Sequence, residues 1–472
     1  MIRVACRYPS ENADDIVRRG LPLIGAISGT SGVRKPEDFG IRVAGRMLAI
    51  TGTVLPPPKL VYKSPMQVIN PGVWNLSSNV AFNRPGLLRT NGDVGCLVIT
   101  FHQSRSTPET TQFMEELGKY LIKYGINWPK RHKPASTLTL TKNSNDNHAL
   151  LDENFLRIKK SGVAFTIIVL PGYDAELYSQ VKYFADMKYG CHTLCVVPKP
   201  PKNAGQGAPL EINKQPSYLA NLALKINLKL GGVNHQLEVA QTSRSSPRIM
   251  YLGIDVTHPT GTESVPQAPS IAGVVANCNS MLVEALSDMV TERLKSWKDQ
   301  ECLPEKVIVY RDGVSESQYK QKVIIVLANY QRFYPVSNEQ LDERSGNVLP
   351  GTVVDRGCTM AREFDFFMVA HAGIQGTCRP AHYVVLKDES NFTANELQNM
   401  THNLSYVFGR ATLSVSIATP VYYADILCER GRCYLYDTFH RKDHEAAVPY
   451  NESQSKWLWG VHKDLAESMF YI

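Results

Sequence analysis

Two stretches of the chain alternate short apolar runs with amphipathic segments, and this alternation limits the possible folds most strongly. Between residues 90 and 240 the apolar runs are GCLVITFH, FTIIVLPGY and HTLCVVP, and TTQFMEELGKYLIKYG, LYSQVKYFADMKYG and YLANLALKINLKLGG lie around them. Apolar runs bounded by turn residues predict buried strands, and the other segments have helical spacing. Strands that alternate with helices form a parallel sheet, so the predicted fold class is α/β.

A second stretch begins after the polar segment QTSRSSP. Its apolar runs RIMYLGIDVTHP, KVIVYRDG and HYVVLKD predict strands. SVSIATPVYYADILCERGRCYLYD predicts a strand followed by a helix, with Thr419 as N-cap and Pro420 at the first helical position. Because 472 residues are too many for one core, we expect several parts. These are a linker over 1–90 and domains over 91–240 and 241–472.

For residues 1–90, the sequence predicts few helices and strands and no independently folded domain. We expect a helix from Ala13 to Leu23 and a strand pair in GIRVAGRMLAITGTVL, followed by extended chain at the prolines of VLPPPKLVY. The apolar content is too small for a separate core. This part should therefore pack on a neighbouring domain.

Charge and cysteine usage limit the class of protein. A net charge of +7 favours an anionic partner such as nucleic acid, although chance explains such a charge equally well. The ten cysteines are scattered, which favours free thiols in a reducing compartment. No apolar run reaches the roughly 18 residues of a membrane span, and the N-terminus does not resemble a secretory signal. We expect a protein of the cytoplasm or the nucleus, without a membrane partner.

Three apolar segments of the last part carry an aspartate: Asp255 in YLGIDVTHP, Asp312 in VIVYRDGVSE and Asp425 in PVYYADIL. A buried carboxylate is costly unless it is paired or binds a metal. Converging carboxylates suit Mg²⁺, with Mn²⁺ as an alternative, and two such ions can promote phosphodiester cleavage. Taken singly, each aspartate is explained better by a strand end, a turn or an exposed helix position. The pattern alone suggests a metal nuclease and does not establish one.

Two predicted helices place cationic or aromatic side chains four residues apart, on one face of the helix. Tyr178 and Lys182 have this spacing in LYSQVK, and Lys225 and Lys229 have it in LALKINLK. Lysines four apart repel each other unless an anion lies between them. Without further information, a solvated basic face remains the simpler explanation.

Several sequence segments resemble motifs of a known family. YLGIDVTHP, VYRDGVSESQ, EFDFFMVAHAGIQGTCRPAHYVVL and SVSIATPVYYAD resemble the PIWI domain of eukaryotic Argonautes, LALKINLKLGGVN resembles the MID domain, and MIRVACRYP with PGVWNL resembles the linker before it. The resemblance follows family order over nearly the whole chain, beginning after the family's N-terminal and PAZ domains. It implies a Rossmann-like MID domain followed by an RNase H-like PIWI domain.

The resemblance also implies a site for the 5′ end of a guide RNA. Tyr178 would stack on the first base, and the 5′ phosphate would be held by charge-assisted contacts from Lys182, Lys225, Lys229 and Arg430. Implied contacts along the guide backbone are Arg379, Arg410, Ser416 and Tyr422. Leu194 stands where the family usually has a glutamine, so one hydrogen bond to the phosphate is expected to be missing. The implied partners are a small guide RNA with a 5′ phosphate, complementary target RNA and proteins of the silencing complex.

For catalysis, Asp255, Asp312 and Asp425 match the first, third and fourth members of the family's acidic tetrad. The second member is a glutamate on a loop after the strand that follows SIAGVV, and here that strand and loop are expected to be missing. Met281 aligns with the glutamate, and the nearby Glu284 does not match the motif. The connection after YRDGVSESQYKQK is also short, near the minimum for a parallel crossover, and the lysine expected after the following strand is not seen.

We therefore expect an Argonaute-type guide-binding protein of RNA silencing with weak or no slicing. The alternative is an active, Mg²⁺-dependent, RNA-guided endoribonuclease. A nucleotide-using metabolic enzyme ranks far behind, because neither GxxxxGK[ST] nor a GxGxxG after a strand is present.

Overall fold

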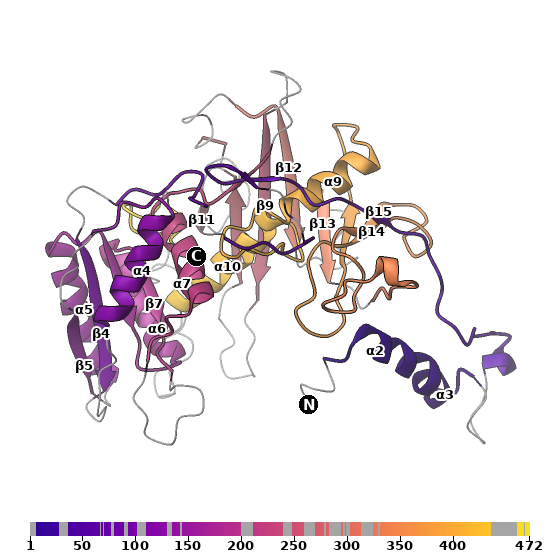
Figure 1. The fold of residues 1–472 in the computed structure, drawn as a ribbon, viewed down its shortest axis with the longest axis horizontal. Helices are drawn as coiled ribbons and strands as arrows, with labels where there is room; N and C mark the ends of the chain where they lie inside the picture. The colour runs from indigo at the N-terminus through magenta and orange to yellow at the C-terminus, as the bar shows by residue number, and fades with distance from the viewer. Residues whose placement is uncertain are drawn as a thin grey trace.

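The computed structural model describes most of the chain, in segments. They are 6–27, 36–66, 68, 70–76, 80–88, 93–101, 110–129, 135–141, 144–199, 211–238, 248–258, 270–277, 280–282, 294–295, 298, 303–312, 324–328, 331–435, 460–466 and 468–472. Figure 1 shows two α/β units side by side, with the indigo N-terminal segment running from one to the other. The first unit contains a four-stranded sheet, and the second contains a nine-stranded sheet.

The sheet of the first unit is parallel, in the order β5-β4-β6-β7. Its strands are β4 (Val94–Phe101), β5 (Ser136–Leu140), β6 (Phe165–Val169) and β7 (Thr193–Val196). Helices α4 (Thr111–Lys123) and α7 (Pro216–Lys229) pack on one face. The other face carries α5 (Ser144–Lys160), α6 (Ala175–Lys182) and the π-helix η3 (Tyr183–Tyr189). The Rossmann-like α/β prediction is confirmed, with β5 and α5 in segments for which no element was predicted.

The sheet of the second unit mixes both strand directions, in the order β1-β14-β15-β16-β13-β12-β9-β10-β11. Antiparallel strands β9 (Ile249–Thr257), β10 (Ile271–Ala276) and β11 (Ser280–Leu282) form one edge. Next to β9, β12 (Lys306–Asp312) and β13 (Ile324–Ala328) run parallel to it. The sheet continues antiparallel through β16 (Ala381–Val385), β15 (Phe364–Val369) and β14 (Thr352–Val354). This arrangement confirms the RNase H-like prediction.

Helices cover the second sheet on the face that carries the candidate acids. Helix α10 (Thr419–Tyr434) crosses β9 and β10, and α9 (Ala394–Leu404) contributes Leu404 to the same core. Residues alternate between the two faces of a strand. Ile308 and Tyr310 of β12 pack toward α10, whereas Met250, Leu252 and Ile254 of β9 pack on the opposite face.

The described residues of the N-terminal segment contribute to the cores of both units. It contains α2 (Pro9–Asp15), the π-helix η1 (Ile16–Gly20), α3 (Leu21–Leu23), the 3-10 helix η2 (Pro36–Phe39), β1 (Thr53–Val54), β2 (Leu60–Val61) and β3 (Pro65–Met66). Strand β1 joins the large sheet beside β14, whereas β2 and β3 pair with β8 (Gln236–Leu237). Leu55 is buried in the core of the second unit, and Tyr62 and Trp74 are buried in that of the first.

Two strand predictions are wrong. In GIRVAGRMLAITGTVL only Thr53–Val54 is a strand, because only these two residues pair with β14. The SVSIAT segment is irregular: Ser414 donates from its backbone to the Gly72 carbonyl and from its hydroxyl to the Ala370 carbonyl. Helix α10 follows with Ala418 as its N-cap, so Thr419 is the first helical residue and not the cap.

The expected absence of a strand after SIAGVV is also wrong. Strand β11 pairs with β10, with Met281 opposite Val274, although β11 is only three residues long. The loop expected to be missing would follow this strand, and Glu284 lies outside the described residues. The shortened connection between β12 and β13, residues 313–323, lies outside them as well.

Helix α10 approaches the sheet so closely that only glycine fits beneath it. A Cβ added to Gly253 of β9 would collide with the backbone of Pro420, and one added to Gly273 of β10 would lie 2.8 Å from both the Ala424 carbonyl oxygen and Cys428 Sγ. Backbone cannot move aside as the end of a flexible side chain can. The sequence YLGIDVTHP therefore requires its glycine for packing.

We predict that Gly253→Ala lowers the free energy of unfolding by about 3 kcal/mol or more, because overpacking here must displace α10. Chemical denaturation followed by circular dichroism measures this change. Gly45→Ala is the matched control, because a Cβ at Gly45 meets no atom within 4 Å. Equal stability of the two variants would contradict the close packing.

Candidate guide-end pocket and acidic cluster

A cavity of about 180 Å³ lies where the two units meet. Helices α6 and α7 and strand β7 of the first unit line it, together with α10, Arg410 and the segment Tyr471–Ile472. We call this cavity the guide pocket, after the role that the sequence resemblance implies for its residues. All five residues implied for the 5′ end of a guide line it: Tyr178, Lys182, Lys225, Lys229 and Arg430. Their convergence follows from the four-residue spacing within α6 and α7 and from the position of α10 between the units.

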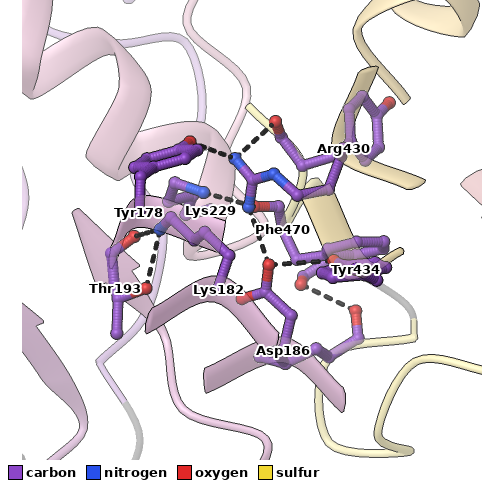
Figure 2. A network of polar contacts seen from close by, with 11 residues as sticks. Tyr178, Lys182, Asp186, Thr193, Lys229, Arg430, Tyr434 and Phe470 are labelled. Carbon is purple, nitrogen blue, oxygen red and sulfur yellow. Dashed lines mark hydrogen bonds and ion pairs between the residues drawn. The ribbon is translucent and has the colours of Figure 1, made fainter. Parts of the chain in front are cut away.

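Lys182 is held by polar groups of the first unit. It is only 2% exposed, and its Nζ donates to Thr193 Oγ1 at 2.8 Å and to the Thr193 carbonyl at 3.3 Å. The same Nζ lies 5.7 Å from the centre of the Tyr178 ring. Figure 2 shows Lys182 with its contacts to Thr193 from close by. The lysine therefore supports the ring that was predicted to stack on a base.

The two lysines of α7 are in an unfavourable electrostatic environment. Burial, Lys182 and Arg430 lower the pKa of Lys229 well below its usual range, and its Nζ donates to the Phe470 carbonyl. Burial, then Arg410 and Lys182, lower the pKa of Lys225 to about 8. Lys225 donates no hydrogen bond to any described residue. A group of crowded, desolvated cations of this kind is suited to accept an anion.

Arg430 lies in the guide pocket, but its guanidinium is engaged by the protein. Nη1 donates to Asp186 Oδ2 at 2.7 Å and to the Phe470 carbonyl at 3.4 Å. Nη2 donates to the Tyr178 hydroxyl and to the Tyr471 carbonyl, both at 3.1 Å. Sequence reasoning missed Asp186, whose one available signal is its position four residues after Lys182 in the same helical segment.

The four residues implied for the guide backbone are only partly brought together. Arg410 lines the guide pocket, where burial lowers its pKa. Ser416 is half-buried in the loop before α10, and Tyr422 packs its ring 4.8 Å from that of Phe408. Arg379 is exposed in the loop before β16.

Three further residues shape these surfaces. Burial and then Arg379 lower the pKa of Arg332, which indicates that the two arginines lie near each other. Sequence reasoning missed Arg332. Leu194 is buried in the pocket wall, where it offers no donor. Glu429 also lines the pocket, and its pKa is raised by burial and Asp425 and lowered by Arg410. No sequence pattern pointed to Arg332 or Glu429.

The three candidate acids come from neighbouring elements. Asp255 lies two residues after Gly253, on the same face of β9, which α10 covers. Asp312 ends the adjacent strand β12. Burial and Asp312 raise the pKa of Asp255 to about 6, with smaller contributions from Asp425 and Glu429. Burial raises the pKa of Asp425. The acids are therefore close enough to interact.

The fit of this cluster to a metal ion is incomplete. Carboxylate oxygens are the donors that Mg²⁺ prefers, so the chemistry of the set is suitable. However, no three His, Cys, Asp or Glu side chains in the described part of the chain converge closely enough to hold a metal ion. The described residues thus provide mutual repulsion among acids without a formed metal site.

Comparison with known proteins agrees with this fold. The Piwi domain model matches residues 165–324 and 321–436, which is more than half of the chain. The arrangement defines the MID and PIWI portion of an Argonaute-type protein, and the chain belongs to the Argonaute family. No helix in the described residues is both long and apolar enough to cross a membrane.

Two plant relatives illustrate the similarity in sequence. Protein argonaute PNH1 of Oryza sativa subsp. japonica is 31% identical over 551 residues, covering 100% of this chain and 53% of the relative. Protein argonaute 10 of Arabidopsis thaliana is 30% identical over 507 residues, covering 92% of this chain and 48% of the relative. The chain thus spans about half the length of the curated relatives it matches.

Solved structures show the same fold at lower identity. Kluyveromyces polysporus Argonaute with a guide RNA superposes with a TM-score of 0.76 at 24% identity, covering 100% of this chain and 61% of that one. Drosophila Piwi gives a TM-score of 0.72 at 17% identity, with coverage of 100% and 63%.

We predict that Lys225→Met raises the free energy of unfolding at pH 7 by about 1–3 kcal/mol, because each unit of pKa depression corresponds to about 1.4 kcal/mol. The folded-state pKa lies below the unfolded value, so the destabilising charge is fully present below pH 8. The destabilisation is lost as the pH rises from about 8 toward 10.5.

Urea unfolding at pH 7 and pH 10 measures this difference. The exposed Lys63→Met variant is the control and should change stability little at either pH. A variant at Lys225 that is less stable than wild type at pH 7 would show that the lysine is not destabilising.

Proposed function

We propose that the chain binds the 5′ end of a small guide RNA in the guide pocket and recognises complementary RNA by pairing in RNA silencing. The observation that carries this proposal is the convergence of Lys182, Lys225, Lys229 and Arg410 around Tyr178. Cations buried together are destabilising alone and become favourable around a phosphate. An aromatic ring beside them offers a stacking surface for a base of any identity.

Family membership supports the proposal. The superposed Kluyveromyces polysporus Argonaute contains a guide RNA, and its fold covers this whole chain. Because residues of both units line the pocket, a ligand bound there would contact both units. Proteins of a silencing complex are further proposed partners, on the same family grounds.

We also propose that this chain slices weakly or not at all. Asp255, Asp312 and Asp425 would be the metal ligands and catalytic acids, and Mg²⁺ or Mn²⁺ would activate water there. The described acids do not converge into a site for such an ion. The rice relative aligns over 551 residues although this chain has 472, so it contains residues without a counterpart here.

A second observation keeps the slicing alternative testable. The pKa of Asp255 is raised partly by Asp312, so two of the acids already interact across adjacent strands. Repulsion between carboxylates is what a divalent cation relieves. An active nuclease would need a further acid from outside the described residues, such as Glu284.

The first experiment compares RNAs that differ only in the 5′ group. We expect a 5′-phosphorylated RNA to bind at least about tenfold more tightly than its 5′-hydroxyl counterpart, because a charge-assisted contact contributes roughly 1.5–3 kcal/mol. Fluorescence anisotropy with purified chain measures both affinities. Lys225→Met should reduce the preference for the phosphate. Equal binding of both RNAs by folded wild type would refute the proposal.

The second experiment measures cleavage by the guide-loaded chain on a fully complementary RNA, with Mg²⁺ or Mn²⁺. We expect a rate at least about 100-fold below that of an active slicer, because a misplacement of about 1 Å already has such an effect. Robust cutting opposite the guide's centre that Asp312→Ala abolishes would establish the alternative. Cutting that survives Asp312→Ala would identify a contaminating nuclease.

A further inference from the structure

We infer that part of the N-terminal segment is an acid-sensitive strap, which holds both units at neutral pH and detaches when two buried histidines beside it are protonated. The strap consists of the described residues between Thr53 and Trp74. Figure 1 shows this part of the chain running between the two units. His402 lies against it in the second unit and His235 in the first. The inference does not depend on the guide pocket, so it stands or falls separately from the proposed function.

His402 of α9 is almost completely buried beside the strap. It is 1% exposed, and neither of its ring nitrogens has a hydrogen-bond partner among the described residues. A Cβ added to Gly351 would lie 2.4 Å from the Leu55 carbonyl oxygen and 3.2 Å from His402 Nε2, so the strap and the histidine are neighbours there. The Leu55 amide anchors the strap by donating to the Gly351 carbonyl at 2.9 Å. A protonated imidazole has two N–H donors, and this environment offers no acceptor for either.

His235 has the corresponding position in the first unit. It is 6% exposed, and its Nε2 lies 2.7 Å from the carbonyl oxygen of Tyr406. Because a carbonyl only accepts, Nε2 carries the proton of the neutral ring, and Nδ1 is buried without a partner in the described part of the chain. Two rings of the strap, Tyr62 and Trp74, lie with their centres 5.1 and 5.6 Å from that of His235. A second proton on His235 would therefore be buried and unpaired against the strap.

Tyr406 joins the strap to both histidines. Its ring centre is 5.2 Å from that of His402, and its carbonyl accepts the hydrogen bond from His235. Its hydroxyl accepts from the Gly72 amide of the strap at 3.0 Å, and its ring stacks on Trp74 at 5.8 Å. A charge on either histidine therefore acts on the residue that holds the strap.

The groups that face the two histidines cannot stabilise such a charge. Burial lowers the pKa of His402 to about 4, and burial also lowers the pKa of His235, although the Tyr406 carbonyl opposes this. Tyr406 and Tyr62 are the titratable side chains in ring contact with them, and burial raises the pKa of both, so they stay neutral. No carboxylate of the described residues contributes to the pKa of either histidine. A buried charge without a partner is costly.

The direction of the pH effect follows from these values. When the strap detaches, the exposed imidazole regains its ordinary pKa of about 6.5. Above that pH both states are neutral and the strap is fully held. As the pH falls toward 4, the detached state binds the proton first and is favoured by about tenfold per pH unit. His402 alone thus favours detachment about 30-fold at pH 5.0 relative to pH 7.5, and His235 acts in the same direction.

Hydrogen–deuterium exchange of the full chain measures the detachment. The reporting amides are those of Leu55, Gly72 and Trp74, which donate hydrogen bonds from the strap to the second unit. We expect their opening equilibrium, corrected for intrinsic exchange rates, to rise about 30-fold or more between pH 7.5 and pH 5.0. Strand β4 is the internal reference. It should change less than about threefold, because detachment of the strap is local and leaves the parallel sheet intact.

His402→Phe tests the first histidine. This substitution keeps a ring and removes both titratable nitrogens, and no hydrogen bond is lost because neither nitrogen makes one with a described residue. The pH-dependent rise at Leu55 should fall to about threefold or less. If this variant does not fold, His402→Leu removes the same nitrogens with a smaller side chain. His258→Phe is the matched control at an exposed histidine and should retain the full rise.

His235→Gln tests the second histidine. Glutamine cannot be protonated in this range and still offers an N–H donor to the Tyr406 carbonyl. The pH-dependent rise at Gly72 and Trp74 should be smaller than in wild type, while the opening at pH 7.5 stays within about threefold. A rise that is unchanged at both amides would remove His235 from the inference.

Two outcomes would overturn the strap itself. The first is a rise at Leu55 that remains about 30-fold in a folded His402 variant. The second is equal opening of the strap and of β4 in wild type, which would show global unfolding and not detachment. Near-UV circular dichroism at each pH shows whether wild type stays folded. If it unfolds at pH 5.0, the same comparison is made at pH 5.5, where the expected rise is about tenfold.

Discussion

The close contact of α10 with β9 and β10 is the constraint on which both candidate sites depend. Only glycine at positions 253 and 273 lets the helix approach this near. Along α10, Asp425 faces the acids of the sheet, and five residues later Arg430 reaches the first unit. Because a helix rises about 1.5 Å per residue, these groups are only about 7–8 Å apart along its axis. A displaced α10 would therefore disturb both sites.

Electrostatic repulsion has different consequences at the two ends of this helix segment. In the guide pocket, the depressed pKa values of Lys225 and Lys229 represent stability that the empty protein lacks and that the proposed phosphate ligand would restore. In the acidic cluster, the raised pKa of Asp255 shows that its negative charge is likewise unfavourable beside the other carboxylates, and a bound cation would relieve this repulsion. Among the described residues, the cations line one shared cavity, whereas the acids do not converge into a metal site.

Local patterns predicted much of the fold and part of the site. The buried strands were readable as apolar runs, and the pairs Tyr178–Lys182 and Lys225–Lys229 were readable as four-residue spacings. What sequence reasoning missed depends on distant partners: Arg430 meets Asp186 across 244 residues, and Lys229 meets Phe470 across 241. GIRVAG and SVSIAT failed as strands for a related reason, since an apolar alternation forms a strand only where a partner edge is available.

Binding without cutting is physically coherent for this chain, because the two sites rely on different elements. The described lining of the guide pocket comes from α6, β7, α7, α10, Arg410 and the segment Tyr471–Ile472. The proposed catalytic site would depend instead on the connections around β11 and between β12 and β13, where the sequence predicts a departure from the family pattern. The Piwi domain match divides into two pieces in the second of these regions, at residues 321–324. Flexible lysines tolerate small displacements of a phosphate, whereas metal-assisted cleavage loses about 100-fold for 1 Å. On the proposed function, a departure from the family pattern in these connections would therefore impair catalysis long before it impairs guide binding.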